Sequence, residues 1–449
     1  MFGWVFIMIG LFLRTTPQKA VAIGTIGGFL LLPFFAYDFP FIPAYDKATS
    51  IALGLILGGA LSGQSRRNPL RMSSYDLPMF IWCFVSPITS SLSNGLGLYN
   101  GISDMVGKLL AWGVFYWAGR KYFSTGTSLR TLTWGFVLGG VVYTPLVLFE
   151  VRMSPQLSNI VYGFFPHDFI QHIRYGGYRP IVFLKHGLMV SLWMAATATA
   201  TFWLWQSKQA KRVRAFPIAP LALLLIAATV LCKSANAWVY LSIGLSGFYY
   251  YRKTKSTLLF RILLLVVPIY ICLRLMRVVS IEQLLAFAGK FFDIQRIESL
   301  TVRLFQEDLF GVRAMQRFMF GWGGFGRGWP VDPNTGQRLI EYVDAFWVIA
   351  ISTSGLLGLV SIFGALGIGS WKVLGLYSRS SRRDSQTSRS AFEVDAIILC
   401  LITSLFLLDS LLNAMASPVY VLGAGALVSY YVNEKASSLA TQNSRLVPQ

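Results

Sequence analysis

Apolar runs separated by short polar and basic stretches recur along the chain from Met1 to about Val432. A helix needs about 20 apolar residues to cross the hydrocarbon core of a bilayer, and fewer where its neighbours support it. Thirteen runs have this character, and they centre on 2–13, 20–36, 48–63, 75–88, 98–118, 129–149, 181–206, 216–232, 236–251, 257–274, 343–374, 393–412 and 414–432. The pattern predicts an all-α polytopic membrane protein, a single integral membrane domain over residues 1–449. It has about 12 transmembrane helices, or 13 if residues 1–13 also span the membrane.

Basic residues gather in the short loops between these runs. Lys and Arg in short loops resist translocation, so the side that carries them is predicted to be cytoplasmic. Five basic clusters fall on one side of the proposed layout: Arg66, Arg67 and Arg71; Arg120, Lys121 and Arg130; Lys208, Lys211, Arg212 and Arg214; Arg252, Lys253, Lys255 and Arg261; and Arg379, Arg382, Arg383 and Arg389. Residues 150–180 and 275–342 then face outward as two long extracytoplasmic, periplasmic loops.

The longer outer loop, residues 275–342, lies between the tenth and eleventh spans. Apolar and polar positions alternate at helical spacing over 281–292 and 300–319, which predicts amphipathic helices on the membrane surface. The loop is also rich in arginine. It is either a solvated loop of mixed charge or an anion-binding site, since the planar fork of arginine matches phosphate oxygens.

Composition supports the membrane class. The chain is 55% hydrophobic and 13% charged, whereas about a quarter of the residues in soluble domains are charged. Its net charge of +20 would indicate nucleic acid in a soluble protein, but here membrane orientation accounts for much of it, so no nucleic-acid partner is predicted. We find no internal repeat of the kind that many transporters show.

A glycine-rich stretch and the three histidines resemble ligand-binding motifs, but neither has the context that such a motif needs. GWGGFG at residues 321–326 matches the dinucleotide pattern GxGxxG, but that pattern needs a preceding strand and a following helix. A helical stretch precedes it here, so the glycines are interpreted as a turn where the backbone packs closely or approaches a ligand. With only His167, His172 and His186 in the chain and no acidic cluster, no metal site and no cofactor is predicted. His167 and His172 are interpreted as solvated loop residues.

Several polar residues fall inside the apolar runs, where such groups are costly and usually paired or functional. Asp104 and Lys108 have i, i+4 spacing, which predicts an ion pair on one helix face. Asp409 and Asn413 have the same spacing, and we favour a bond between helices over a proton relay. Glu150 is a further candidate.

Three segments together resemble the O-antigen ligase and O-antigen polymerase superfamily of bacterial membrane enzymes, which move lipid-linked glycans. Arg179-Pro-Ile-Val-Phe-Leu-Lys-His186 is similar to the family's Arg followed seven residues later by His or Asn at the end of an outer loop. The stretch from Arg303 to Gly321 resembles its Arg-led helix that ends in a glycine turn. The segment from Asp344 to Gly358 opens the span after the large loop, as the family's third segment does.

The chain departs from the family pattern at two points. Family ligases commonly carry His at the position of Asp344, where it is proposed to activate the acceptor hydroxyl, whereas polymerase-type members often have Asp. Lys233-Ser-Ala-Asn-Ala stands where the family tends to have Ser-Arg-Gly. The resemblance therefore implies a polysaccharide polymerase of the bacterial inner membrane, acting at the periplasmic face, with a ligase as the alternative. Its partners would be a polyprenyl-pyrophosphate-linked glycan donor, a glycan or lipid acceptor, membrane lipids, and export or chain-length proteins.

The residue types fit that chemistry. Transfer from a polyprenyl pyrophosphate needs the developing negative charge to be stabilised, and fixed cations do this without a metal. Arg179 and Arg303 are the candidates, followed by Lys233 and Arg313.

The acceptor hydroxyl needs a group that takes its proton, and a carboxylate or an imidazole does so. Asp344 and His186 are the candidates for this base. The simpler reading of Asp344 is a helix N-cap, and that of His186 is a polar group at a helix entry.

Two other classes compete with the glycosyltransferase. A flippase of lipid-linked sugars also needs about 12 spans and an anion-binding interior, but the missing repeats and the asymmetric outer loop disfavour it. The third class is a scaffold for a polysaccharide-secretion complex.

Overall fold

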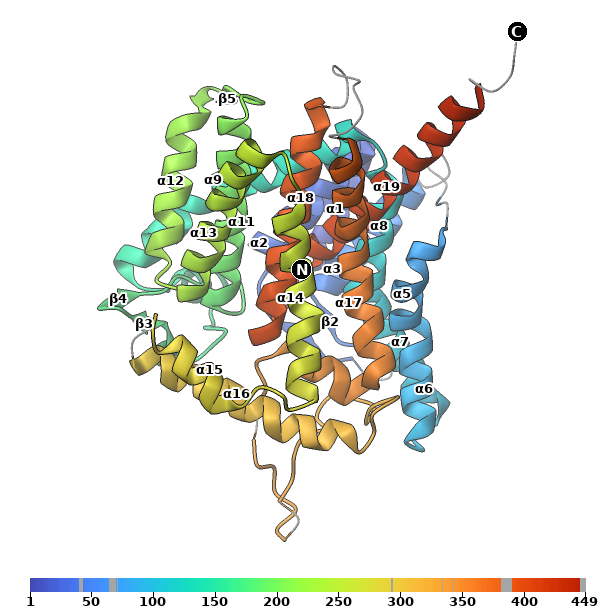
Figure 1. Cartoon of the computed structure of the whole chain (residues 1–449), viewed down its shortest axis with the longest axis vertical. Coiled ribbons are helices and arrows are strands. Elements are labelled where there is room, and N and C mark those ends of the chain that lie inside the picture. The colour runs from blue at the N-terminus through green and yellow to red at the C-terminus, as the bar shows by residue number, and fades with distance from the viewer. Residues whose placement is uncertain are drawn as a thin grey trace.

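The computed structural model describes residues 1–39, 43–63, 70, 72–291, 294–332, 334–340, 342–380 and 390–444. Figure 1 shows a bundle of helices whose long axes run mostly from one end of the molecule to the other. The α-helices are α1 (Phe2–Arg14), α2 (Pro17–Leu31), α3 (Lys47–Leu61), α5 (Leu77–Phe80), α6 (Ser86–Ser93), α7 (Gly97–Lys108), α8 (Val114–Tyr122), α9 (Gly126–Met153), α10 (Leu157–Tyr162), α11 (Gly187–Gln206), α12 (Ile218–Leu231), α13 (Ala235–Thr254), α14 (Leu258–Leu275), α15 (Ile281–Ala288), α16 (Ile294–Met315), α17 (Phe346–Ser380), α18 (Ser390–Leu412) and α19 (Pro418–Ser444).

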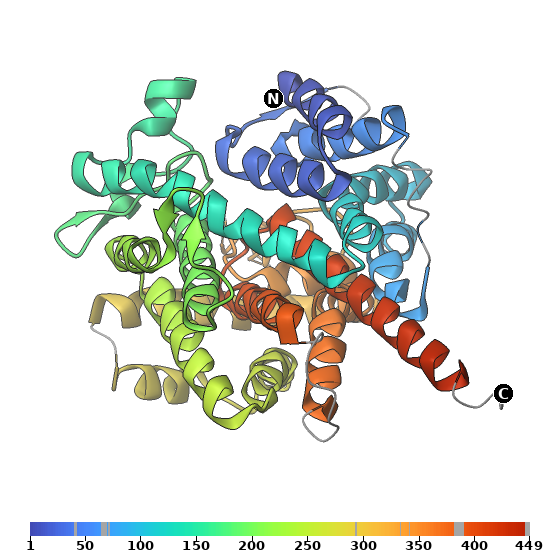
Figure 2. The ribbon, with the colours of Figure 1, turned by 90° about the horizontal axis from the view of Figure 1, so that it is seen from above.

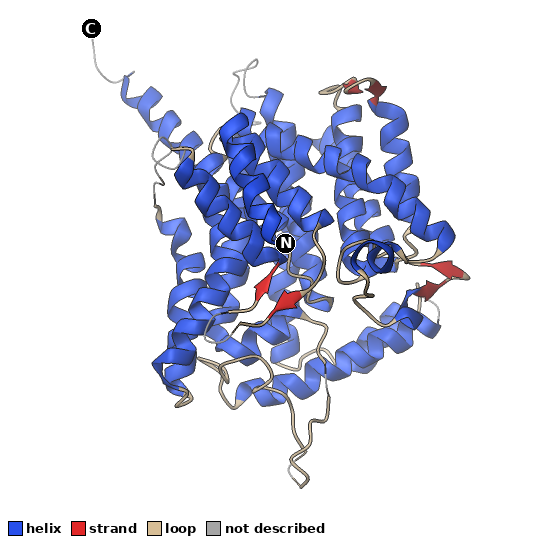
Figure 3. Cartoon of the chain, turned by 180° about the vertical axis from the view of Figure 1, so that it is seen from behind, coloured by secondary structure: helices blue, strands red, loops and turns tan. Residues whose placement is uncertain are grey.

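Other backbone forms are short. The 3₁₀ turns are η1 (Ser74–Asp76) and η4 (Phe169–His172), and the π-helical segments η2 (Ile81–Val85) and η3 (Leu109–Gly113) join neighbouring α-helices. Strands in the described residues form three two-stranded antiparallel hairpins (Figure 3), namely β1 (Ala36–Tyr37) with β2 (Tyr45–Asp46), β3 (Ile173–Arg174) with β4 (Gly177–Tyr178), and β5 (Arg212–Val213) with β6 (Phe216–Pro217).

The predicted all-α membrane class agrees with the structure. Five helices in the described part of the chain, α9, α11, α14, α17 and α18, are long and apolar enough to cross a membrane. Each of the thirteen predicted runs overlaps a helical segment, but α1, α3 and α12 are apolar and shorter. Of the five predicted basic clusters, Arg66, Arg67, Arg71, Arg382, Arg383 and Arg389 lie outside the described residues.

One predicted boundary is wrong. The run 181–206 was expected to be helical from its start, but α11 begins at Gly187. The carboxylate of Glu150, near the end of α9, accepts hydrogen bonds from the backbone amides of Ile181 and Val182 at 2.8 and 2.7 Å. Val182 has a left-handed φ of 51°, which the interior of a right-handed helix does not contain, so the residues before Gly187 form a turn in place of a helix.

The centre of the bundle is built around α11, whose apolar stretch is buried on all sides. A helix that is apolar around its whole circumference is stable in such an interior position. It packs against α9, α12, α13 and α18. In the view from above, α9 crosses the molecule obliquely, with the N-terminal helices α1–α3 on one side of it and α12–α14 on the other (Figure 2).

Both amphipathic helices predicted for residues 275–342 are present, as α15 and α16. They differ from the predicted 281–292 and 300–319 mainly at the start of α16, which begins at Ile294. Figure 1 shows them lying across one end of the bundle, opposite the end that carries the β5–β6 hairpin and the C-terminus. The segment 150–180 contains the end of α9 and folds further into α10, η4 and the β3–β4 hairpin.

Candidate functional site

A cavity of about 1110 Å³ lies between α16 and the ends of the bundle helices. Its wall includes residues of α11, α13, α14, α16 and α18, together with the segments before α11 and α17. Four of the six predicted site residues line it: Arg179, His186, Arg303 and Asp344. These residues lie up to 165 positions apart in the sequence. The fold therefore brings into one cavity four residues that were predicted separately.

The cavity wall carries both cationic and apolar side chains. Among the described lining residues the charged ones are Arg174, Arg179, Lys185 and Arg303, against the carboxylate of Asp344. The apolar part is formed by Val239 and Ile243 of α13, Leu263 and Val266 of α14, and Leu408, Leu411 and Leu412 of α18. Such a lining suits a molecule that carries both an anionic group and a hydrocarbon portion.

Arg303 and Asp344 contact each other directly. The Nε atom of Arg303 on α16 donates to Oδ2 of Asp344 at 3.1 Å, and both side chains remain partly exposed. Asp344 lies two residues before the first residue of α17, and its carboxylate is bonded to this guanidinium. The predicted cation and the predicted base are thus partners in this structure.

A buried ion pair holds α16 in place beneath the bundle. Arg274, near the end of α14, contacts the carboxylate of Glu307 at 2.9 Å and that of Asp308 at 2.8 Å. The hydroxyl of Tyr270 donates to the same Glu307 oxygen at 2.8 Å. Glu307 follows Arg303 by one helical turn, so this anchor fixes the position from which Arg303 enters the cavity.

Arg179 is buried, with only 4% of its surface exposed. Its side chain passes over Gly187, where an added Cβ would lie 2.3 Å from Arg179 Cδ, so the glycine makes room for the guanidinium. An Nη atom of Arg179 donates to the carbonyl of Lys233 at 3.4 Å. The Lys233 side chain does not line the cavity; its Nζ donates to the carbonyl of Tyr175 at 3.3 Å.

His186 is the N-cap of α11, as its simpler reading anticipated. Its Nδ1 accepts a hydrogen bond from the Leu188 amide at 3.0 Å. Burial lowers the pKa of His186 to about 2, and the charge of Arg179 adds to this effect. The ring is therefore neutral, with its proton on Nε2, because Nδ1 is the acceptor. Neither nitrogen is available to take a proton in this arrangement, which leaves Asp344 as the base candidate.

The three histidines meet, contrary to the interpretation of His167 and His172 as solvated loop residues. Their ring centroids are 4.7, 5.4 and 5.8 Å apart, and His172 is fully buried. Burial, followed by the charge of Arg179, lowers the pKa of His172 to about 4. Sequence reasoning missed the cluster because an irregular loop gives no periodic signal for which of its residues will touch.

Arg313 is not brought to the cavity. Its guanidinium stacks on the ring of Trp322 at 3.6 Å, and the Trp322 indole N–H donates to the Arg313 carbonyl at 3.0 Å. Arg313 thereby holds the end of α16 against the glycine turn that follows it. A cation–π contact of this kind is structural and satisfies a guanidinium without an anion.

The glycines at 321–326 form a turn that packs closely against a break in α17, in agreement with their interpretation as a close-packed turn. Gly355 has a left-handed φ of 65° inside α17. The amides of Trp322 and Gly323 donate to the carbonyls of Ser352 and Thr353, at 2.8 and 3.0 Å. A Cβ on Gly321 would lie 2.6 Å from the backbone of residues 353–355, so the close approach requires glycine.

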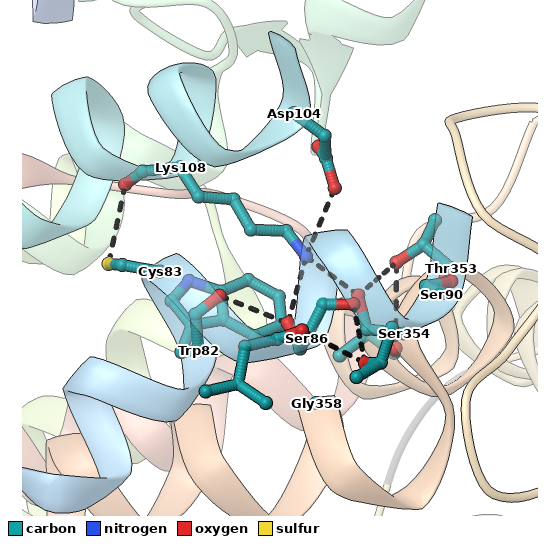
Figure 4. A network of polar contacts seen from close by, with 12 residues as sticks. Trp82, Cys83, Ser86, Ser90, Asp104, Lys108, Thr353, Ser354 and Gly358 are labelled. Carbon is teal, nitrogen blue, oxygen red and sulfur yellow. Dashed lines mark hydrogen bonds and ion pairs between the residues drawn. The ribbon is translucent and has the colours of Figure 1, made fainter. Parts of the chain in front are cut away.

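A polar network supports this break from the other side (Figure 4). The Lys108 ammonium pairs with Asp104 at 3.3 Å, as predicted, and also donates to the Ser354 and Ser86 hydroxyls at 2.8 and 3.2 Å. Ser90 donates to the carbonyl of Thr353 at 2.7 Å. The network satisfies polar groups next to the break and links it to α6 and α7.

The pair Asp409 and Asn413 joins helices, as expected. Asn413, one residue past the end of α18, donates to Asp409 of α18 at 2.6 Å, and the hydroxyl of Tyr240 on α13 donates to the same carboxylate oxygen at 2.9 Å. Tyr240 lines the cavity, and no sequence motif indicated it. The bond fixes the α13 wall relative to α18.

The sequence matches none of the family models and none of the curated proteins with which it was compared. Functional inference therefore proceeds from the geometry of the cavity.

Proposed function

We propose that the protein is a membrane glycosyltransferase that polymerises polyprenyl-pyrophosphate-linked oligosaccharide repeat units at the outer face of the bacterial plasma membrane. In this proposal the chain crosses the inner membrane about 12 times, and α15 and α16 lie on the periplasmic side. The observation that carries the proposal is the cavity, which joins Arg179, Arg303 and Asp344 to an apolar wall.

The cationic residues of the cavity wall suit a leaving pyrophosphate. In the proposed reaction the acceptor hydroxyl oxygen attacks the anomeric carbon, and the bond from that carbon to the pyrophosphate oxygen breaks with inversion. Negative charge then develops on the pyrophosphate, and guanidinium groups held in a partly dry site stabilise it without a metal ion. Arg179 is buried, so its charge acts with little screening by water, whereas Arg303 is half-buried and its charge is screened more.

The carboxylate of Asp344 accepts the proton that the acceptor hydroxyl loses. The same carboxylate accepts a hydrogen bond from Arg303. A bound pyrophosphate competes for the same guanidinium, which releases the carboxylate toward the acceptor. Donor binding and activation of the base are coupled in this way through one arginine.

The apolar wall suits the first part of the prenyl chain. The wall residues from α13, α14 and α18 include the aliphatic Val239, Ile243, Leu263, Val266, Leu408, Leu411 and Leu412. Burying aliphatic groups is worth about 0.8 kcal/mol per CH₂. A donor held at both its pyrophosphate and its lipid is fixed in orientation, and such orientation contributes directly to the rate.

The test is incubation of the purified full-length protein, in detergent with EDTA, with a short polyprenyl-pyrophosphate oligosaccharide, followed by gel analysis of the glycan. A ladder of longer lipid-linked products is expected. Transfer only after addition of a lipid or protein acceptor would assign the alternative ligase function. Absence of any new glycosidic bond, with movement of the donor across liposome membranes, would assign a lipid-linked sugar flippase.

A further inference from the structure

The three histidines of the chain form one cluster beside Arg179. Each offers a ring nitrogen, and these atoms all lie within 4.8 Å of one another. His167 and His186 line the cavity, and His172 lies behind them. A cluster of this kind binds either a metal ion, through three lone pairs, or an anion, through N–H groups.

Hydrogen bonds from the backbone decide between these possibilities. The Leu188 amide donates to Nδ1 of His186 at 3.0 Å, and the Asp168 amide donates to Nδ1 of His167 at 2.8 Å. A backbone amide is always a donor, so both Nδ1 atoms carry lone pairs, and each neutral ring has its proton on Nε2. Metal ligation through Nε2 would require that proton to move and the backbone bond to be lost.

The surrounding charges also favour an anion. Arg174, Arg179, Lys185 and Arg303 line the same cavity, with Asp344 as the opposing carboxylate. The charge of Arg179 acts on both His172 and His186. A divalent cation at this place would be repelled by the arginines, whereas an oxyanion would gain both their attraction and the imidazole hydrogen bonds.

His172 completes the argument. Neither of its ring nitrogens has a hydrogen-bond partner among the residues that the structure describes, although the side chain is fully buried. A buried N–H without an acceptor costs about 1–3 kcal/mol. An oxygen held between the three ring nitrogens, which lie within 4.8 Å of one another, would remove that cost.

We infer that His167 and His186 form a neutral hydrogen-bond-donor subsite for an oxygen of a phosphate-type anion, next to Arg179 and backed by His172. The inference rests on the proposed function, in which that anion is the pyrophosphate of the lipid-linked donor. It gives His186 the role of a donor in place of a base, and adds His167 and His172 to the site. Neutral donors hold the oxyanion without adding charge, so the product pyrophosphate is still able to leave.

The experiment is titration of the full-length protein in detergent with inorganic pyrophosphate by calorimetry, with His167→Asn, His186→Asn and His186→Gln. In both Asn variants the amide oxygen reproduces the Nδ1 acceptor while the Nε2 donor is lost. Asn is also a favoured N-cap, so α11 keeps its cap in His186→Asn. Gln places an amide donor near the Nε2 position. We expect each Asn variant to bind pyrophosphate about tenfold more weakly, which is about 1.4 kcal/mol, and His186→Gln to bind more tightly than His186→Asn.

Other outcomes separate this inference from the proposed function. If both Asn variants bind like the wild type while Arg179→Gln does not, the donor subsite is wrong and the arginine clamp stands. If the wild type fails to bind pyrophosphate at all, both are wrong. Zn²⁺ binding that the Asn variants lose, with pyrophosphate affinity unchanged, would identify a metal site and overturn the inference.

Two further measurements guard the interpretation. Melting temperatures identify any variant that fails to fold, and His167→Asn, on a partly exposed side chain, carries the test if His186→Asn is unstable. Titration in nanodiscs of phosphatidylglycerol and of phosphatidylcholine separates the two sources of a phosphate group. Equal pyrophosphate affinities are expected, and a loss confined to phosphatidylglycerol would assign the subsite to a lipid headgroup instead of the donor.

Discussion

Arg303 Nε and Asp344 Oδ2 lie 3.1 Å apart, so the guanidinium and the carboxylate proposed for opposite halves of one reaction are bonded to each other. The pair joins α16 of the long loop to the segment that enters α17. An exposed or half-exposed ion pair is worth at most about 1 kcal/mol. In the proposed reaction a pyrophosphate group therefore displaces it at little cost.

Replacement of Arg303 tests its role as the pyrophosphate clamp. We expect Arg303→Ala to reduce product formation by at least about 100-fold, comparable to loss of one preorganised donor to a developing anion. Product formation by Arg303→Lys is expected to lie between that of the wild type and that of Arg303→Ala, because an ammonium keeps the charge but not the planar fork. The measurement is the yield of lipid-linked product at equal protein levels. Normal yield from Arg303→Ala would remove this arginine from the proposal.

Asp344→Asn separates binding from catalysis. Loss of the base is expected to lower the rate about 10²–10⁴-fold. Pyrophosphate affinity is expected to stay the same or to increase, because the variant no longer neutralises Arg303. Rates and affinities are measured on the same preparation. Full activity in this variant would exclude Asp344 as the base while leaving the arginine clamp intact.

Glu307→Gln tests the anchor of α16. The Glu307 carboxylate is buried and bonded to Arg274, whereas that of Asp308, on the same arginine, is 39% exposed. Removing one charge of a buried pair costs about 3–5 kcal/mol, so a clear drop in melting temperature and in transfer rate is expected. Asp308→Asn is the matched control, with an expected loss of at most about 1 kcal/mol. Equal effects of the two substitutions would contradict the assignment of Glu307 as the anchor.

The buried histidines predict a loss of stability in acid. The folded-state pKa of His172 is lowered to about 4 and that of His186 to about 2, each from an ordinary value of 6.5. Protons then bind preferentially to the unfolded chain below pH 6.5, so stability is full above that pH and falls as the pH drops toward 4. Each such group contributes about 1.4 kcal/mol per pH unit in that window.

The acid effect is measured as melting temperature between pH 8 and pH 4.5. Burial, followed by the charges of Arg179, His167 and Arg174, lowers the pKa of His172. The substitution His172→Phe removes this one titrating group and leaves those three neighbours in place. We expect a flatter pH profile from this variant. A profile that matches the wild type would show that His172 does not titrate with unfolding.

Gly355→Ala tests the break in α17. Its φ is 65°, and an added Cβ would lie 2.4 Å from the carbonyl carbon and oxygen of Met319, which are backbone atoms unable to move aside. Strain and overpacking together predict a loss of about 2 kcal/mol or more. The control is Gly367→Ala in the same helix, where the new Cβ would be 3.7 Å from Leu407 and a stabilisation of up to about 1 kcal/mol is expected. Similar melting temperatures for the two variants would show that the break tolerates a side chain.

The sequence predicted most of the helices and four of the residues that line the cavity for identifiable reasons. Apolar periodicity reports burial along one element, and it located α16 because one face of that helix is apolar. It missed the start of α11, since no local pattern shows the turn at Val182, whose amide is bonded to Glu150 of a different helix. Motif spacing named Arg179 and Arg303 separately, but no local pattern encodes a meeting of His167 with His186 or the placement of Tyr240 in the cavity wall.

The bonds between the glycine turn and α17 mean that the long loop, residues 275–342, is not a removable module. The amides of Leu356 and Leu357 donate to the carbonyls of Phe318 and Met319, and the amides of Trp322 and Gly323 donate to the carbonyls of Ser352 and Thr353 in the first half of α17. Deletion or exchange of residues 275–342 would leave those α17 groups unsatisfied, at a cost of several kcal/mol each in an apolar medium. A chimera that grafts this loop onto another bundle must therefore carry α17 with it.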